Sequence, residues 1–192
     1  FRWSMALIVC AIGAEYSLVF WGPDLLRDRA DFGPAAAAAS LAAVTAGMAL
    51  GRAFGSRLAL RFAPTTLMRA AVIVALIGFT IAWTFTSGTA VITGLFVTGL
   101  GLSLLWPLGL SRAIWASGGR ANAAASSASL FVNIAIALAP FALGVLADAF
   151  DIHLALLLVP ILLMISLIIL LATAAPAPTD SGIATDAATA RS

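Results

Sequence analysis

The protein has 192 residues, of which 62% are hydrophobic and only 9% are charged. Soluble globular domains carry about 45–50% apolar and about 25% charged residues, so this composition excludes a soluble domain and indicates a chain that lies in a lipid bilayer. The net charge of +2, with ten arginines and no lysine, is too small to indicate nucleic acid as a partner.

Six apolar stretches are each long enough to cross a bilayer, which takes about 20 residues. None shows the alternation with a period of two that a transmembrane strand needs, so each is predicted to be a helix. The predicted fold class is an all-α membrane protein, a six-transmembrane-helix bundle over residues 1–173. The predicted spans are 3–21, 34–51, 66–86, 90–111, 125–147 and 152–173. Because the chain begins with Phe1, we expect it to be a piece of a longer protein.

The first span contains Glu15, the only glutamate of the sequence. The span begins like a signal peptide, but its apolar run continues to Trp21 and five spans follow, which favours a membrane helix. An acid near the middle of a span costs about 2.5–3.5 kcal/mol on insertion scales, and a carboxyl in a low-dielectric site can exchange a proton near neutral pH. Our hypothesis is that Glu15 faces a central cavity and carries a coupled proton or holds a substrate group, with Tyr16 as a neighbouring hydroxyl. A neutral Glu15 that only hydrogen-bonds an adjacent helix remains the alternative.

The second span carries Gly47, Gly51 and Gly55 at intervals of four, which brings them to one helix face. Small residues at this spacing are typical of close helix packing. Arg52, Arg57 and Arg61 follow the predicted span and are expected to form a basic cytoplasmic turn. The third span, like the sixth, is apolar on almost every face, so both are predicted to be outer helices surrounded mainly by lipid.

The fourth span contains Trp106 followed by Pro107, and a proline inside a helix removes one backbone hydrogen bond. We therefore expect an interrupted helix here. Together with the first span, this span is expected to supply an aqueous pathway, for which its small and polar residues are candidates: Gly94, Gly99, Gly101, Ser103 and Gly109. For Trp106, lining a cavity and anchoring at the membrane interface remain equally open, because aromatic residues also gather at span ends.

The fifth span carries small or polar residues at steps of three or four, which line one face: Ser126, Ser129, Asn133, Ala137, Pro140, Gly144 and Asp148. Packing or a kink is the expected role of Pro140 and Gly144. Asn133 is more open to a functional role, because an amide in hydrocarbon needs a partner or a cavity.

The last segment, residues 174–192, is low in large apolar residues and is predicted to be a disordered cytoplasmic tail. With six spans, eight of the ten arginines fall on the side of both termini and two on the other. The positive-inside rule therefore predicts that both termini face the cytoplasm. Four tryptophans at predicted span ends are expected to be interface anchors: Trp3, Trp21, Trp83 and Trp115.

Three segments resemble the C-terminal six-helix half of the major facilitator superfamily of secondary transporters. Residues 14–29 (AEYSLVFWGPDLLRDR) are similar to its seventh helix and the following loop. Residues 47–62 (GMALGRAFGSRLALRF) resemble the end of its eighth helix and the basic turn, although the acidic residue of that family signature is missing here. Residues 138–151 (LAPFALGVLADAFD) resemble its eleventh helix.

This resemblance implies two three-helix repeats within a twelve-helix transporter, whose N-terminal six-helix half is missing from this chain. The partners that it implies are a small-molecule substrate, with protons as a candidate coupling ion, and the lipid bilayer of the cytoplasmic membrane. It also implies that the first and fourth helices line the cavity, that the second and fifth meet the other half, and that the third and sixth face lipid. Under this interpretation the candidates for the substrate or proton pathway are Glu15, Tyr16, Trp106 and Asn133.

Enzymatic alternatives find little support in the sequence. An intramembrane serine protease needs a serine in a glycine-flanked turn, but Ser103 lacks the following glycine, and His153 is the only histidine. One histidine, one cysteine and scattered acids predict no metal site, and no cofactor or catalytic residue is expected. The remaining alternative is a self-contained six-helix channel or a homodimeric half-size transporter.

Overall fold

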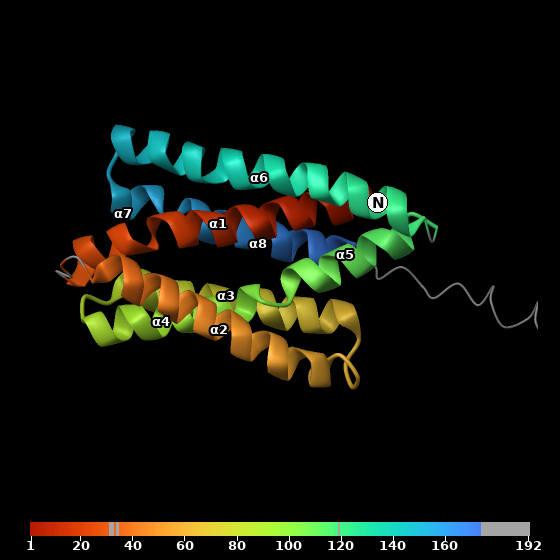
Figure 1. The fold of residues 1–192 in the computed structure, drawn as a ribbon, viewed down its shortest axis with the longest axis horizontal. Coiled ribbons are helices and arrows are strands. Elements are labelled where there is room, and N and C mark those ends of the chain that lie inside the picture. The colour runs from red at the N-terminus through yellow and green to blue at the C-terminus, as the bar shows by residue number, and fades with distance from the viewer. Residues whose placement is uncertain (31–32, 34, 119, 174–192) are drawn as a thin grey trace, which may run out of the picture.

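The computed structural model describes residues 1–30, 33, 35–118 and 120–173, and these residues form helices and no strands. The helices are α1 (Arg2–Ala30), α2 (Ala36–Leu58), α3 (Pro64–Thr84), α4 (Gly88–Leu102), α5 (Leu105–Ala116), α6 (Ala121–Ala149), α7 (Ile152–Ala155) and α8 (Leu158–Ala172). They run back and forth along one long axis (Figure 1). The predicted tail at 174–192 lies outside the described residues.

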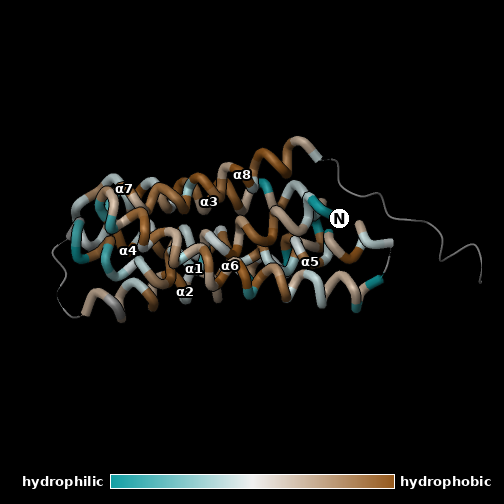
Figure 2. The backbone as a smooth tube through the Cα atoms, turned by 90° about the horizontal axis from the view of Figure 1, so that it is seen from above, coloured by the Kyte–Doolittle hydropathy of each residue, from teal (hydrophilic) through white to brown (hydrophobic). Residues whose placement is uncertain are grey.

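Six helical segments of this part of the chain are long and apolar enough to cross a membrane, which indicates a multi-pass membrane protein. They are Arg2–Asp28, Ala38–Leu58, Pro64–Thr84, Gly88–Ala116, Ala121–Ala149 and Ile152–Ala172. The predicted all-α architecture with six spans is thereby confirmed. Hydrophobic residues dominate the middle of the bundle and hydrophilic ones gather toward its two ends (Figure 2).

Helix α1 is longer than the sequence predicted. Its candidate span of 27 residues runs from Arg2 to Asp28, and Pro23 lies inside the helix without ending it. Thirteen residues of this span precede Glu15 and thirteen follow it, so Glu15 lies at the midpoint. Trp21, which was expected at the end of a span, lies inside the helix.

Two of the six spans are interrupted, in each case just before a proline. The fourth span leaves the helix at Ser103 and Leu104, one turn before Pro107, and the last span does the same at Leu156 and Leu157, one turn before Pro160. A proline has no N–H to donate to the carbonyl four residues earlier, and its ring crowds that carbonyl. Pro140, in contrast, lies within a continuous α6.

The glycine stripe of α2 lies against the backbone of α4. A Cβ atom at Gly47 would overlap the carbonyl oxygen of Phe96, and one at Gly51 would overlap Ser103. On its other side α4 packs against α3, where Gly94 lies against the backbone of Ala82. Helices α2, α4 and α3 therefore form a closely packed layer with few side chains between their backbones.

Helix α1 lies at the centre of the bundle and α6 at its edge (Figure 1). Helix α1 contacts α2, α4, α5, α6, α7 and α8, and 61% of its most apolar 18-residue stretch is buried inside the bundle. For α6, which contacts α1, α5 and α7, the buried share is 11%. The third span (α3) and the sixth span (α7 and α8) were expected to face lipid most, but they are buried to 44% and 39%. The fifth span, α6, is therefore the most open of the six.

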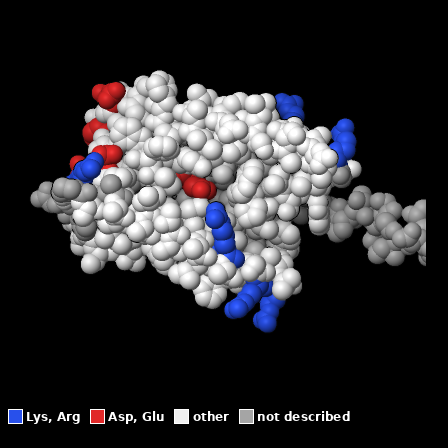
Figure 3. All heavy atoms as spheres, in the orientation of Figure 1, with Lys and Arg blue, Asp and Glu red and all other residues white. Residues whose placement is uncertain are grey.

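Charged groups outside the middle of the bundle are divided between its ends (Figure 3). The start of α1, the end of α2, the start of α3 and the start of α6 form one end, which we call the arginine-rich end: Arg2, Arg57, Arg61 and Arg120. The opposite end, which we call the acidic end, carries Asp24, Asp28, Asp148 and Asp151. Asp24 forms an ion pair of 3.1 Å with Arg27 there.

Candidate functional site

Two opposite charges line one cavity of about 270 Å³ between α1 and α2. Three side chains come from α1 and five from α2: Glu15, Tyr16, Val19, Leu41, Thr45, Met48, Ala49 and Arg52. We call this space the Glu15–Arg52 cavity. In this cavity the acid at the midpoint of the most buried span, α1, lies next to a base from the neighbouring helix α2.

The helical period explains why α2 can serve both this cavity and the packing against α4. Leu41, Thr45, Met48 and Arg52 are spaced by four, three and four residues, so they share one stripe of the helix. The stripe of Gly47 and its relatives lies on the neighbouring face. Close packing of that face onto α4 therefore fixes the rotation of α2 and turns Arg52 toward α1.

The two charged groups of the cavity are not joined directly. Among the described residues, Arg27–Asp24 is the one ion pair with an N···O distance within 4.0 Å. Arg52 nevertheless lies near enough to exert a Coulomb field on the Glu15 carboxyl. Within the described part of the chain neither side chain forms a hydrogen bond, so both remain open to a ligand in the cavity.

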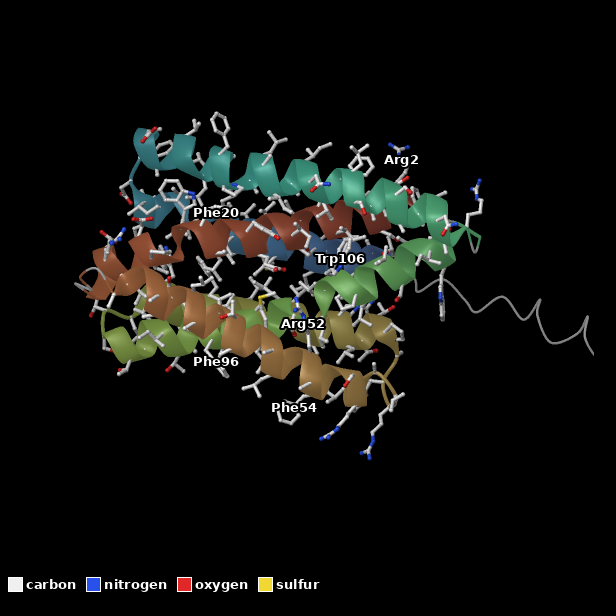
Figure 4. The ribbon with its side chains drawn as sticks, viewed as in Figure 1. Arg2, Phe20, Arg52, Phe54, Phe96 and Trp106 are labelled. Carbon is white, nitrogen blue, oxygen red and sulfur yellow. The ribbon has the colours of Figure 1, made fainter. Side chains whose placement is uncertain are left out.

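A second cavity, of about 370 Å³, shares Arg52 with the first. Its other lining residues come mainly from the last turns of α2 and from the break before α5: Gly55, Ser56, Ala59, Leu67, Leu104, Trp106, Pro107 and Leu108. Figure 4 shows Arg52 and Trp106 near one another, midway along the length of the bundle. Arg52 therefore stands between the acid of the first cavity and the indole of the second.

The structure brings together some of the residues predicted for the pathway and leaves one apart. Glu15 and Tyr16 line the first cavity, and Trp106 lines the second. Asn133 is exposed on α6, lines neither cavity and has no hydrogen-bond partner among the described residues. Its amide faces outward from the bundle, on the same exposed face of α6 as Ser129 and Ala137.

The basic turn predicted after the second span is shorter than expected. Arg52 and Arg57 lie on α2, which continues to Leu58, and only Arg61 lies in the connection before α3. Gly55 does not end the helix, because it packs against Leu104. The chain leaves the helix before Pro64, which occupies the first turn of α3, where its missing N–H costs nothing.

The small residues of the fourth span pack against neighbouring helices and do not line an aqueous pathway within this chain. Gly94 and Gly101 lie against the α3 backbone, Gly99 lies against Val44 of α2, and Gly109 lies against Ile8 of α1. The buried Ser103 donates a hydrogen bond to the carbonyl of Leu100, 2.7 Å away. The expectation of an aqueous role for these residues is corrected accordingly.

Two of the four expected interface tryptophans bond inside the bundle. The indole N–H of Trp21 donates to the carbonyl oxygen of Pro140 at 3.1 Å, and its ring packs on Gly144. The indole of Trp83 donates to the carbonyl of His153 at 3.0 Å and stacks on its imidazole. Trp3 and Trp115 are exposed.

Two arginines that entered the sequence argument only through their charge bind the end of α8. Arg69 of α3 donates to the carbonyl of Leu170, with Nη2 2.6 Å from the oxygen. Arg112, largely buried at the end of α5, donates to the hydroxyl of Thr173. Cations are favourable at a helix C-terminus, where carbonyl groups lack partners, so these contacts fix α8 in the bundle.

Arg52 is the site residue whose role sequence analysis missed, since it was assigned to a turn. The signal was the helical spacing of four, three and four residues from Leu41 through Thr45 and Met48, which reaches Arg52 if the helix continues. Among the described residues, no group of three or more His, Cys, Asp and Glu side chains could hold a metal ion. Comparison with protein-family models and with curated proteins finds no match for this chain.

Proposed function

We propose that this chain is the C-terminal six-helix half of a secondary active transporter of the major facilitator type, which moves a small molecule across the cytoplasmic membrane by alternating access. The observation that carries the proposal is the Glu15–Arg52 cavity, because ionisable residues inside membrane spans are expensive and are typical of substrate or proton pathways. The sequence resemblance supplies the family.

Glu15 is the proposed proton carrier. It lies at the midpoint of its span, which suits a group that exchanges protons with each side in turn. When it loses its proton, its carboxylate shares the cavity with the Arg52 guanidinium, and the two charges balance. When it is protonated, Arg52 is the one formal charge among the residues that line the cavity.

The proposed membrane orientation places both termini in the cytoplasm. The arginine-rich end would then face the cytoplasm, as the positive-inside rule requires, while the acidic end would face outward. The two three-helix repeats of the proposal are 1–84 and 88–173, which contain one uninterrupted set of three spans and one set with two proline breaks. Broken helices are typical of transporter spans near a substrate site.

The experiment uses the complete protein that contains this chain, reconstituted in vesicles with a pH-sensitive dye inside. Small sugars, metabolites and drugs are added from outside, and proton entry is recorded with and without an imposed pH gradient. We expect Glu15→Gln to abolish the dependence of flux on the gradient, while Asp24→Asn, at an exposed ion pair, retains it. Unchanged flux and unchanged pH dependence in Glu15→Gln would eliminate the proton role.

The open face of α6 favours a second candidate, a homodimeric half-size transporter. Only 11% of the most apolar stretch of α6 is buried, so this helix has room to pack against another bundle. That bundle is the missing half in the first proposal and a second copy of this chain in the second. Ser129→Cys in a Cys10→Ser background distinguishes them in native membranes. A disulfide that joins two copies supports the homodimer, whereas a monomer that crosslinks only to an engineered cysteine in the first half supports the twelve-helix protein.

A further inference from the structure

The Glu15–Arg52 cavity holds one acid and one base that face the same space without pairing. Within the described residues neither group has an ion pair or a hydrogen bond, although both line the same volume of about 270 Å³. Glu15 is half-buried and Arg52 is exposed at the surface of this bundle, and under the proposed function both lie within membrane spans, where a charge is costly unless it is paired. The space between the two groups therefore favours a ligand that pairs with both.

The remaining wall of the cavity is divided between hydroxyl and apolar groups. Tyr16 and Thr45 contribute hydroxyls, and the Thr45 hydroxyl donates to the carbonyl of Leu41 at 2.6 Å, which leaves its lone pairs to accept. The apolar part consists of Val19, Leu41, Met48 and Ala49. A ligand that fits has a polar part near the charges and a compact apolar part.

The sum of charges on the wall limits the net charge of the ligand. With Glu15 and Arg52 both ionised, the lining is neutral overall, so an anion would satisfy Arg52 and leave the carboxylate unpaired, and a cation would do the reverse. A neutral sugar would hydrogen-bond to both groups but would compensate neither charge. A zwitterion satisfies both at once, with its ammonium group toward the acid and its carboxylate toward the guanidinium.

We infer that the solute of this site is a small zwitterion that carries an ammonium and a carboxylate group, of which the neutral amino acids are the chemical class. Arg52 binds the carboxylate through its planar donor group, Glu15 accepts from the ammonium, and Val19, Leu41 and Met48 contact the apolar side chain. The inference rests on the proposed transport function, since it names the substrate of that same site.

The first test compares three probes that share the same isobutyl group in the complete wild-type protein in detergent, by the shift of its thermal unfolding midpoint. Leucine carries both charges, 4-methylpentanoate only the carboxylate, and 3-methylbutylamine only the ammonium group; glycine and phenylalanine cover smaller and larger amino acids. We expect the amino acids to bind at least about tenfold more tightly than either singly charged probe, because each lost charged hydrogen bond costs that much. If no amino acid binds, or if 4-methylpentanoate binds as tightly as leucine, the inference is overturned.

The second test uses variants that should reverse the order of preference between the two singly charged probes and leucine. Glu15→Gln is expected to lower leucine affinity by about tenfold or more and to make 4-methylpentanoate the better of the two probes, since only the carboxylate partner remains. Arg52→Gln is expected to favour 3-methylbutylamine instead. Arg57→Gln, on the same helix but outside both cavities, retains the wild-type order. Equal losses for all probes in both variants would indicate damage to the fold and would contradict the inference, because a zwitterion site must change its order of preference.

Vesicle experiments separate this inference from the proposed function. Leucine that binds but shows no flux in either direction would leave the ligand class standing and would overturn the transporter. Established flux of another solute, with which none of the three amino acids competes, would leave the transporter standing and would overturn the zwitterion.

Discussion

Helices α2 and α6 each carry a stripe of small residues, yet their surroundings differ completely. The stripe of α2, centred on Gly47 and Gly51, meets the backbone of α4 at overlap distance for any larger residue. Along α6, Ser129, Asn133 and Ala137 are exposed, and the Trp21 ring of α1 meets the stripe near its end, at Pro140 and Gly144. The same pattern therefore marks a filled interface in one helix and an empty one in the other, so the spacing alone does not reveal whether the partner belongs to the same chain.

The largest effect on stability is expected from filling the α2 stripe. Gly47→Val places a branched side chain against the carbonyl of Phe96, which cannot move without displacing α4, and we expect a loss of about 3 kcal/mol or more. Ala137→Val on α6 is the matched change at an exposed position and is expected to stay within about 0.5 kcal/mol of the wild type. Thermal unfolding in detergent, followed by far-UV circular dichroism, compares the two. Equal losses would mean that the α6 stripe is also filled within this chain.

The next effect compares Arg112, which is bonded to the end of α8, with an exposed arginine of the arginine-rich end. Arg112→Gln removes a charged donor from the Thr173 hydroxyl at the end of α8, and we expect a loss of about 1.5–3 kcal/mol. The exposed Arg57 serves as the control, and Arg57→Gln is expected to change stability by no more than about 0.5 kcal/mol. Urea-induced unfolding in mild detergent measures both. A silent Arg112→Gln would show that this contact does not stabilise the end of α8.

A smaller effect is expected where α6 is attached to α1. Trp21→Phe keeps an aromatic ring near Gly144 but removes the hydrogen bond to Pro140, for a loss of about 0.5–1.5 kcal/mol. Because the bond joins two helices, hydrogen exchange in α6 should accelerate more than in α3. Acceleration spread evenly over the bundle would contradict a local role for this bond.

The smallest effect on the stability of the bundle is expected at Asn133. Asn133→Leu exchanges an exposed amide, which has no partner among the described residues, for an apolar side chain and should leave the unfolding midpoint of this chain almost unchanged. In the complete protein the same change is expected to reduce flux, since the amide would lie against the second bundle. Loss of stability in the six-helix chain itself would show that Asn133 has a partner there.

Much of the architecture could be predicted from hydrophobic length and from proline. The six spans follow from apolar runs of bilayer length, and the interruption before Pro107 follows from its missing N–H. The same rule applied to Pro160 would have predicted the break between α7 and α8, so that signal was present in the sequence and was not used. The first, second, fourth and fifth spans are longer than predicted, and the first is longer because α1 continues through Gly22-Pro23, a pair that is typical of turns.

The site was harder to predict, for a physical reason that Arg52 illustrates. An arginine followed by Gly55 resembles the start of a turn, because intrinsic preference disfavours glycine in a helix. Tertiary packing overrides that preference here, since Gly55 fits against Leu104 and α2 continues beside α4. Only this extension brings Arg52 to Glu15. The acid itself could be recognised from the sequence, since it is the single carboxylate deep in any span, whereas its basic neighbour depends on how two helices rotate.

The close packing of α2, α4 and α3 has a mechanical consequence. Where backbone touches backbone, there is no layer of rotatable side chains to absorb sliding, so these three helices respond to a load as one stiff plate. Arg52 is mounted on that plate, while Glu15 is mounted on α1, which meets the plate through ordinary side chains. The distance between the two charges therefore changes whenever α1 moves relative to α2, α4 and α3. A pair of spectroscopic distance labels, one attached near each charge, would measure this movement in the working protein.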